Sequence, residues 1–537
     1  MNIKRNLSYI LVISSCSLLF FLKSGTHTAF EWTTTQDIPL ILRIIDPNFI
    51  NNDFYTNSIV GSPRFIFSYI VYGFTLLGFD WYSTLYFLKL FLVVSVPSLI
   101  FLTIQSVFIK WHPYSEKLKH YDIAQIILFL AAIGFFATVI DKSPLGLAFG
   151  WNSIQLYATK NLNPMTLSFL VGLLYNISTF NSSKFRYVSP ALLLISALIH
   201  PVIGIYHFIF SMTFKLPISL EKRSFIELGL DFIIGILGVI VFLYFFREKS
   251  NSIDAATFID IYVYSRHPHH YLMSSLFGWS SIIWILFLFF PVFLSLKANK
   301  RKYLILSSIV FTLFISAPII QFLGTEVWKF KEIAILGPSR FTAYVSIFWV
   351  LNTMIVGFSV YKNNASLNLE KTHSLLRFLF YFLSKLQDKQ KLYTFLFIVV
   401  FLNAFYFTHK HPLDYYKKAQ IRETVEWILE NTKDDSVFFV HGLDSFFVRV
   451  YAKRAVFADD AFPFNEGDVK EFSERYTIYK NSKKFAPSDY ACLTRYHNLN
   501  FLILPKNQGF NEYDPLFSNN FWQVYDVSSF NTSELLC

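Results

Sequence analysis

The sequence predicts a mostly α-helical, polytopic membrane protein with a small extracytoplasmic α/β domain at its C-terminal end. Of its 537 residues, 54% are hydrophobic and only 15% are charged, and the mean hydropathy is +0.42. A soluble globular chain of this length does not have such a composition. Many apolar stretches are also long enough to cross the hydrocarbon core of a bilayer, which takes about 20 residues. Residues 409–537 lose this pattern, so the helical membrane part is expected to end near residue 408.

The charge of the chain supports this organisation. Residues 409–537 carry 15 Lys+Arg and 18 Asp+Glu, so the net charge of +11 comes entirely from residues 1–408. Lysine and arginine in the loops between spans hold those loops in the cytoplasm. The positive charge therefore indicates topology and gives no support to a nucleic-acid partner.

The spans can be followed in order from the N-terminus. Residues 6–21 follow Lys4 and Arg5, which places the N-terminus in the cytoplasm, and no small-residue cleavage site follows. Basic flanks around 187–214 and a proline after His200 predict two short helices with a break there. Short interfacial helices are expected at 64–79 and 375–383. Single crossings are expected at 81–109, 123–140, 164–180, 225–246, 271–296, 303–322, 341–361 and 392–407. This gives about eleven transmembrane helices, with the C-terminus outside.

The last part of the chain has the pattern of a compact α/β domain. Residues 414–432 have helical spacing, with Ile421, Val425, Ile428 and Leu429 on one face. Short β-rich runs at 437–441, 501–505 and 522–527 predict strands, and a further helix is expected at 467–481. The predicted domains are therefore 1–408, including an acidic first outer loop at 24–63, and 409–537.

The three cysteines do not decide whether the chain contains a disulfide. Cys16 lies in the first predicted span, whereas Cys492 and Cys537 lie in the outer domain. An oxidising compartment would permit the last two to pair, but their spacing does not show whether they do.

The first outer loop is the most informative polar segment. It carries Glu31, Asp37, Asp46 and Asp53 directly behind the first span. Carboxylates held at a membrane surface are suited to a membrane-borne phosphate substrate, either as a base or through a divalent metal. A solvated loop without a function is the alternative.

Three further polar clusters fall on the outer face under this topology. Asp141 ends the third span, Asp260 precedes the segment Arg266–His270, and Glu326 precedes Arg340. Arginine and histidine side chains in the later loops could hold a phosphate group. For His267, His269 and His270 the alternatives are a metal site or a structural turn. His200 is expected to pack at a helix break, and the Asp459-Asp460 pair is either a solvated turn or a sugar or metal contact.

The layout resembles the GT-C class of membrane glycosyltransferases. The resemblance lies in a first helix, a large acidic outer loop, a second acid in the next outer loop, many helices and an outer C-terminal domain. Carried over by position, it implies that the catalytic acids are Asp46 or Asp53 together with Asp141. The first loop lacks the paired acids of those enzymes. The chain also resembles bacterial multipass membrane proteins that share DP…ND (Asp46 to Asp53), RHPHHYL (Arg266 to Leu272) and AFPF (Ala461 to Phe464), which implies no particular activity.

The GT-C resemblance implies a glycosyltransferase in a bacterial inner membrane. It would move a sugar from a polyprenyl-phosphate-type donor to an acceptor on the periplasmic face, with membrane lipid and lipid-linked sugar as partners and no nucleic acid. Asp46, Asp53 and Asp141 are the candidate catalytic residues and possible metal ligands. Whether a divalent cofactor such as Mg²⁺ or Mn²⁺ is needed is left open. Arg266, His267, His269, His270 and Arg340 are the candidate phosphate-binding residues. The alternatives are a lipid or polysaccharide transporter or flippase, an O-antigen-type polymerase or ligase, and a non-catalytic envelope assembly factor.

Overall fold

The computed structural model describes most of the helical part and nearly all of the C-terminal part of the chain. The described residues are 32–61, 65–112, 162–180, 187–222, 253–275, 279–298, 300–365, 415–463 and 466–530, with isolated positions at Ser14 and between 223 and 252. The candidate residue Asp141 lies outside them, as do the side chains of His269 and His270.

The chain divides into two compact units. The first comprises Met1–Ala29, Tyr86–Tyr244 and Ala255–Lys410, and the second comprises Phe30–Leu85, Phe245–Asp254 and His411–Cys537. The first outer loop therefore groups with the C-terminal segment, although the sequence analysis places it with the helices. The reason is a set of buried contacts between the loop and that segment, described below.

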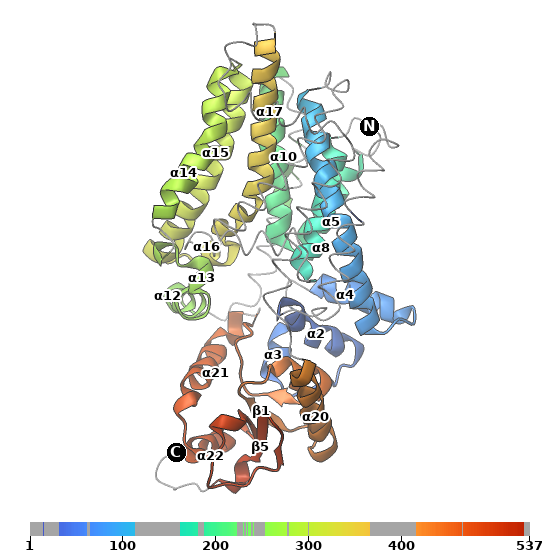
Figure 1. The fold of residues 1–537 in the computed structure, drawn as a ribbon, viewed down its shortest axis with the longest axis vertical. Coiled ribbons are helices and arrows are strands. Elements are labelled where there is room, and N and C mark those ends of the chain that lie inside the picture. The colour runs from blue at the N-terminus through green and yellow to red at the C-terminus, as the bar shows by residue number, and fades with distance from the viewer. Residues whose placement is uncertain are drawn as a thin grey trace. The chain divides into compact units, whose positions relative to one another are not determined.

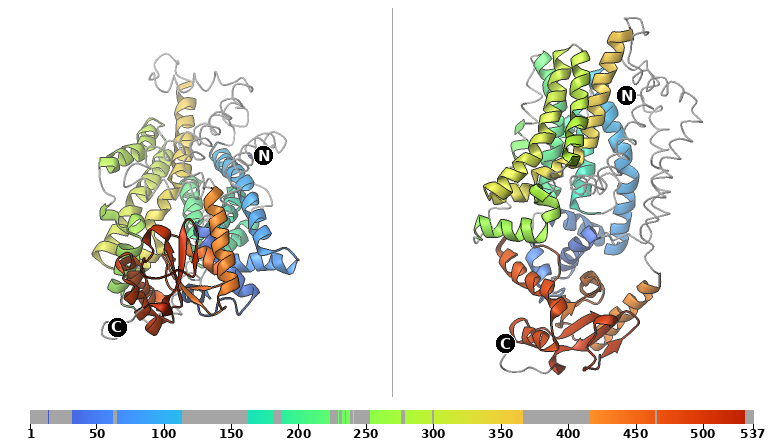
Figure 2. Two further views of the ribbon diagram at one scale, coloured as in Figure 1. Left: turned by 60° about the horizontal axis from the view of Figure 1, so that its bottom comes forward. Right: turned by 60° about the vertical axis from the view of Figure 1, so that its left-hand side comes forward.

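The first unit is helical, and its long helices run alongside one another (Figures 1 and 2). The closest packing joins α8 to α9 and α10, and α14 to α15 and α17, while α10 contacts α15. Its described elements are α5 (Trp81–Trp111, which begins in the second unit), α8 (Pro164–Phe180), α9 (Ser189–Ile199), α10 (Pro201–Lys222), α12 (Ala255–Ile259), η4 (Asp260–Arg266), α13 (Pro268–Tyr271), η5 (Met273–Ser275), α14 (Trp279–Lys297), α15 (Arg301–Phe322), η6 (Leu323–Val327), α16 (Lys331–Leu336), η7 (Pro338–Tyr344) and α17 (Val345–Ala365).

Three helical stretches among the described residues are long and apolar enough to cross a membrane. They are Trp81–Trp111, Pro201–Glu221 and Arg301–Val327, and a bent pair, Lys331–Tyr344 with Ile347–Val360, would be a fourth. The predicted spans 6–21, 123–140 and 392–407, most of 225–246, and the interfacial helix 375–383 fall outside the described residues. The number of about eleven crossings stays a prediction.

Several helix boundaries follow the sequence, and two differ. The predicted break at His200 is confirmed, since α9 ends at Ile199 and α10 begins at Pro201. However, α10 continues to Lys222 and is not short. The helix expected from residue 271 begins only at Trp279, because the preceding chain forms the short turns α13 and η5 around Pro268.

The second unit combines helices from the first outer loop with an α/β fold from the C-terminal segment. Its elements are α2 (Trp32–Ile45), α3 (Phe54–Ile59), α4 (Phe65–Leu76), α20 (Tyr415–Asn431), β1 (Val437–Val440), η9 (Phe447–Tyr451), β2 (Ala455–Val456), η10 (Glu466–Asp468), α21 (Val469–Asn481), η11 (Ser482–Lys484), α22 (Pro487–His497), β3 (Phe501–Pro505), η12 (Lys506–Gln508), β4 (Phe517–Ser518), β5 (Trp522–Asp526) and η13 (Val527–Ser529). The three strands and two helices expected after residue 409 are therefore confirmed.

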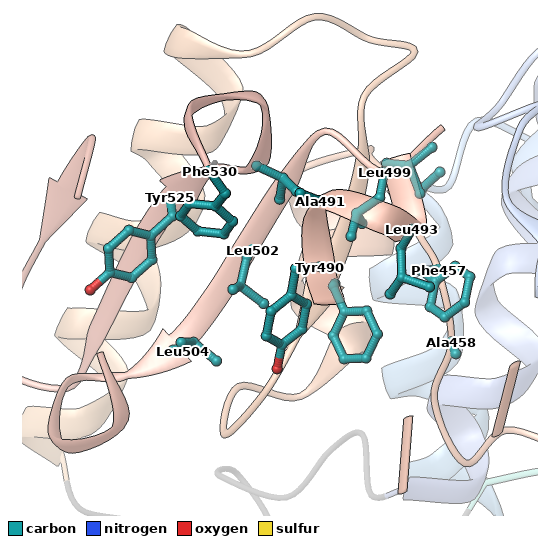
Figure 3. Close-up of a cluster of buried hydrophobic side chains, with 14 residues drawn as sticks. Phe457, Ala458, Tyr490, Ala491, Leu493, Leu499, Leu502, Leu504, Tyr525 and Phe530 are labelled. Atoms are coloured by element: carbon teal, nitrogen blue, oxygen red, sulfur yellow. The ribbon is translucent and has the colours of Figure 1, made fainter. Parts of the chain in front are cut away.

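The sheet has the order β2-β1-β3-β5-β4. Strand β1 is parallel to β2 and β3, whereas β5 is antiparallel to both β3 and β4. The runs VFFV and FLIL are apolar throughout because helices cover both faces of the sheet. Phe439 of β1 faces a cluster with α22, whereas Phe438 faces a cluster with α20. Figure 3 shows the first cluster, in which Leu502 of the sheet lies near Tyr490 of α22 and Tyr525 lies near Phe530.

Two details of this domain refine the sequence analysis. On α20, Val425 and Ile428 are buried as predicted, but Leu429 is 41% exposed, so the buried face is narrower than the apolar pattern. Cys492 is disulfide-bonded, and the other two cysteines, Cys16 and Cys537, lie outside the described residues.

Candidate functional site

The Arg266–His270 segment forms a tight turn lined with aromatic rings in the first unit. The π-helical η4 ends at Arg266, and Pro268 opens α13 at a position where a missing N–H costs nothing. Within this turn the Tyr262 and Tyr271 hydroxyls lie 2.8 Å apart, and the His267 ring centroid is 4.9 Å from that of Tyr262. The segment therefore presents a rigid tyrosine and histidine surface at its described positions.

Arg340 lies against this surface. The turn η7 that carries it begins after Gly337, whose φ of +56° favours glycine, and a Cβ there would lie 3.0 Å from the Tyr271 ring. The Arg340 backbone N–H donates to the Gly337 carbonyl (2.8 Å), and its guanidinium carbon lies 4.8 Å from the Tyr271 ring centroid. Residues from two separate predicted clusters are thus in contact.

Further contacts join the same two segments. The Lys329 ammonium donates to the Asp260 carboxylate (3.1 Å) and lies 4.3 Å from the Tyr264 ring centroid. The Ser274 N–H donates to the Glu326 carboxylate (3.1 Å). These carboxylates are therefore engaged in holding the two segments together, and neither of them pairs with Arg340.

The charge of Arg340 lacks an acidic partner in the part of the chain that the structure describes. Its Nε is buried without a hydrogen-bond partner there, and no carboxylate forms an ion pair with it. A guanidinium stacked on an aromatic ring keeps its in-plane N–H groups available for a planar or tetrahedral anion. The arrangement is suited to binding a phosphate or carboxylate group.

Asp53 has a different environment, in the second unit. It is fully buried and caps α3, where its Oδ1 accepts from the Thr56 N–H (2.7 Å) and hydroxyl (2.8 Å). Its Oδ2 accepts from the Arg449 Nε (2.9 Å) and from the Val456 N–H (2.9 Å). Both oxygens are therefore occupied, and Asp53 links the first outer loop to the C-terminal segment of the chain.

Arg449 completes this buried cluster. Its side chain is 4% exposed and also pairs with Asp459, while its guanidinium lies 5.1 Å from the Tyr55 ring centroid. The pKa of Arg449 is raised because the Asp459 and Asp53 charges outweigh the effect of burial. Two carboxylates neutralise this arginine, so the cluster has the composition of a structural ion-pair network.

Asp46, the other acid expected in the first loop, is exposed. Its carboxylate accepts from the Asn48 N–H (2.9 Å), and Arg43 ties the same loop together through the Ile50 carbonyl and the Asn57 side chain. Asp46 is thus accessible to a substrate on an ordered loop. Its position relative to Asp141 is not described, because Asp141 lies outside the described residues.

A small pocket adjoins the Arg449 cluster at the C-terminal ends of β1 and β2. It has a volume of about 30 Å³ and is lined in part by Tyr55, Asp444, Asp459 and Asp460. Burial raises the pKa of Asp444. The pocket is small, and three of its lining side chains are acidic.

No group of three histidine, cysteine or acidic side chains within the described ranges could hold a metal ion. A metal site made by Asp46, Asp53 and Asp141 together remains a prediction, since Asp141 is not among those residues. The two described members differ sharply, because Asp53 is saturated by protein donors and Asp46 is not.

The sequence analysis did not identify a buried polar group inside the first unit. His207 of α10 contacts the Asn176 amide nitrogen through Nδ1 (2.9 Å) and the Tyr344 hydroxyl through Nε2 (3.1 Å). The ring fits because Gly172 has no side chain; a Cβ there would lie 1.9 Å from a His207 ring atom. The sequence feature that could have indicated this group is the histidine inside the apolar run GIYHFIF. Arg449 has a similar feature, because it lies inside the apolar run FFVRVY.

Compared with known proteins, the chain matches no protein-family model and no curated protein sequence.

Proposed function

We propose that the protein is an integral membrane glycosyltransferase that moves a sugar from a polyprenyl-phosphate-type donor to an acceptor on the outer face of a bacterial inner membrane. The observation that carries the proposal is Arg340, a half-buried arginine whose buried Nε has no hydrogen-bond partner and which has no carboxylate partner among the described residues. Apolar helices long enough to cross a membrane occur in the same unit. A phosphate attached to a lipid matches both features.

Energetics favour an anionic ligand at Arg340. Arg340 is half-buried, and its Nε is shielded from water without a hydrogen-bond partner among the described residues. Leaving such a buried donor unpaired costs about 1 to 3 kcal/mol, whereas a cation–π contact contributes about 0.5 to 2 kcal/mol. The Tyr271 ring alone does not balance that cost. A phosphate that accepts hydrogen bonds from the guanidinium would balance that cost. Arg266 and His267 from the neighbouring turn would add further contacts.

The transfer step requires a base as well as a phosphate site. The acceptor hydroxyl oxygen bonds to the anomeric carbon of the sugar while the bond from that carbon to the phosphate oxygen breaks. The phosphate leaves with the electron pair, Arg340 stabilises its charge, and a carboxylate takes the hydroxyl proton. Asp141 is the proposed base, since both carboxylate oxygens of Asp53 already accept hydrogen bonds from protein donors.

The test compares lipid-linked sugars and surface glycans in cells that lack the protein. These cells are complemented with wild type, Arg340→Gln, Asp46→Asn, Asp141→Asn or Arg422→Gln at matched membrane levels. Arg422 is the matched control, an exposed arginine paired only with Glu426. We expect Arg340→Gln to leave the glycan missing and its lipid-linked donor accumulated, and Arg422→Gln to restore it. Full restoration by Arg340→Gln would contradict the proposal.

A lipid or polysaccharide transporter is a second candidate. The buried Asn176–His207–Tyr344 group favours it, because polar residues inside apolar helices often line a transport path. The two functions differ in where the lipid-linked sugar accumulates in deletion cells. A missing transferase leaves it on the outer leaflet, where a membrane-impermeant lectin reaches it in spheroplasts. A missing transporter leaves it on the inner leaflet, where the lectin does not.

A further inference from the structure

Two neighbouring residues of α10 bond to both ends of the turn that carries Arg340. The Tyr206 hydroxyl donates to the carbonyl of Gly337 (3.0 Å), the residue just before η7. The His207 Nε2 lies 3.1 Å from the hydroxyl of Tyr344, the last residue of η7. The seven residues of the turn are therefore held between adjacent positions of a single helix.

His207 is itself fixed in place. Its second ring nitrogen contacts the Asn176 side chain of α8 at 2.9 Å, and its ring packs 5.3 Å from the Phe169 ring. All of these side chains are buried. An imidazole that uses one nitrogen as donor and the other as acceptor satisfies both contacts. Since the chain of contacts ends at an amide, which does not pass protons on, it is suited to holding a position and not to moving a proton.

The turn also has little room to move on the side of Tyr271. The left-handed Gly337 lies close to the Tyr271 ring, and the Phe341 ring stacks on that of Phe314 at 5.1 Å and 7°. The Tyr206 ring packs against that of Phe341 at 5.1 Å. Arg340 thus projects from a turn that is constrained at its ends and along its length.

We infer that Tyr206 and His207 are positioning residues that fix the turn 338–344 and thereby hold Arg340 in the geometry needed to bind a lipid-linked phosphate. Their effect on the ligand rests on the proposed function, whereas their effect on the turn does not. Neither residue touches the ligand in this assignment. Both act through the backbone and side chains of the turn.

The experiment uses Tyr344→Phe in the full-length protein in lipid nanodiscs. This variant keeps the ring and removes only the hydroxyl that contacts His207. Tyr490→Phe is the matched control, because it removes a similar buried hydrogen bond, from the Tyr490 hydroxyl to the Ser482 carbonyl (3.0 Å), in the other unit. Amide hydrogen exchange of peptides covering 337–345 reports on the turn, and titration with a polyprenyl phosphate reports on binding.

We expect Tyr344→Phe to speed exchange in the 337–345 peptides by about fivefold, the change expected for one lost hydrogen bond. Exchange in α14 peptides should stay unchanged, and polyprenyl-phosphate affinity should fall by a similar factor. The affinity loss should vanish when Arg340→Gln is already present, since the two changes affect one interaction. Tyr490→Phe should alter neither readout.

Unchanged exchange in the turn would overturn the inference. So would faster exchange without any loss of affinity in a protein that binds polyprenyl phosphate. If the wild type does not bind polyprenyl phosphate at all, the proposed function fails. Faster exchange in Tyr344→Phe would then still support the fixing of the turn by α10.

Discussion

At the scale of single residues, the buried Arg449 and the half-buried Arg340 have opposite surroundings. Arg449 is neutralised by Asp53 and Asp459. Arg340 lies on the Tyr271 ring and has no acidic partner among the described residues. The charge of Arg449 is balanced by carboxylates of the protein, whereas no carboxylate of the described residues balances the charge of Arg340. This difference is the basis for assigning structure to one cluster and substrate binding to the other.

The role of Asp53 can be tested by substitution. Asp53→Asn replaces the oxygen that accepts from Arg449 and from the Val456 N–H, and leaves these buried donors unsatisfied, which costs about 1 to 3 kcal/mol although Asp459 still pairs with Arg449. We expect this loss in the unfolding free energy of the second unit, measured by pulse proteolysis of the full-length protein in urea. Asp46→Asn, at an exposed position, should change it by less than about 0.5 kcal/mol. A stable but inactive Asp53→Asn protein would instead support the catalytic role that the GT-C resemblance implies.

His441 makes the stability of the same unit depend on pH. Burial, aided by Lys483, lowers the pKa of His441 to about 4, and its Nε2 lies 2.7 Å from the Ser482 hydroxyl. The unfolded chain therefore binds a proton at a higher pH than the folded chain does. The stabilisation is present above pH 6.5 and is lost as the pH falls from 6.5 toward 4, by about 3 kcal/mol in total.

The measurement is the unfolding free energy of the second unit at a series of pH values between 7 and 4. His441→Gln should flatten the pH dependence relative to wild type. His497, whose pKa burial also lowers, and Asp444, whose pKa burial raises, are present in both proteins, so the difference isolates His441. Identical slopes in the two proteins would contradict the assignment.

At the scale of helices and strands, close packing of α9 on α10 depends on Gly204. A Cβ at Gly204 would lie 2.6 Å from the Cα of Ala197, which is backbone and has no easy way to move. Small residues at such crossings let helices approach closely in membranes.

Gly204→Ala is therefore expected to destabilise the first unit by about 1 to 3 kcal/mol, the usual cost of overpacking. Gly357→Ala is the control, because nothing lies within 4 Å of its added Cβ in α17. That change should stabilise the helix by up to about 1 kcal/mol. Thermal unfolding in nanodiscs distinguishes the two, and equal effects would show that the α9–α10 contact is looser than described.

The elements of the fold followed from local patterns, and the contacts of the site did not. Apolar length predicted α8, helical spacing predicted α20, and short β-rich runs predicted β1 and β3, because all three signals depend on neighbouring residues. The pairing of Asp53 with Arg449 joins positions 396 residues apart, and no local pattern indicates it. The contact of Arg340 with Tyr271 likewise joins distant positions, and it depends on the contacts of α10 with η7, the turn that carries Arg340. The sequence therefore suggested both Arg340 and Asp53 as candidate site residues. It did not indicate that Asp53 lies in a buried ion-pair network and that Arg340 does not.

At the scale of the whole molecule, we predict that Cys492 and the basic connection between α14 and α15 are exposed to different compartments. A disulfide persists in an oxidising compartment, whereas the basic residues Lys300, Arg301 and Lys302 at the start of α15 are of the kind that is retained in the cytoplasm. This topology is a prediction.

Labelling in intact cells tests the topology. After mild reduction, a membrane-impermeant maleimide should react with Cys492 in intact spheroplasts. A cysteine introduced as Lys300→Cys, at an exposed position, should react only after lysis. Reaction of both, or of Lys300→Cys alone, in intact spheroplasts would contradict the predicted orientation.

The central claim is that Arg340 binds the phosphate of a lipid-linked substrate. The most direct measurement is titration of the full-length protein in nanodiscs with a polyprenyl phosphate and with the matching polyprenol, which lacks the phosphate. The account predicts that wild type binds the phosphate form at least tenfold more tightly, as is expected for a charge-assisted contact at a partly buried arginine. Arg340→Gln should abolish that preference, and Arg422→Gln should preserve it. Equal binding of the two lipids by wild type, or an unchanged preference in Arg340→Gln, would contradict the claim.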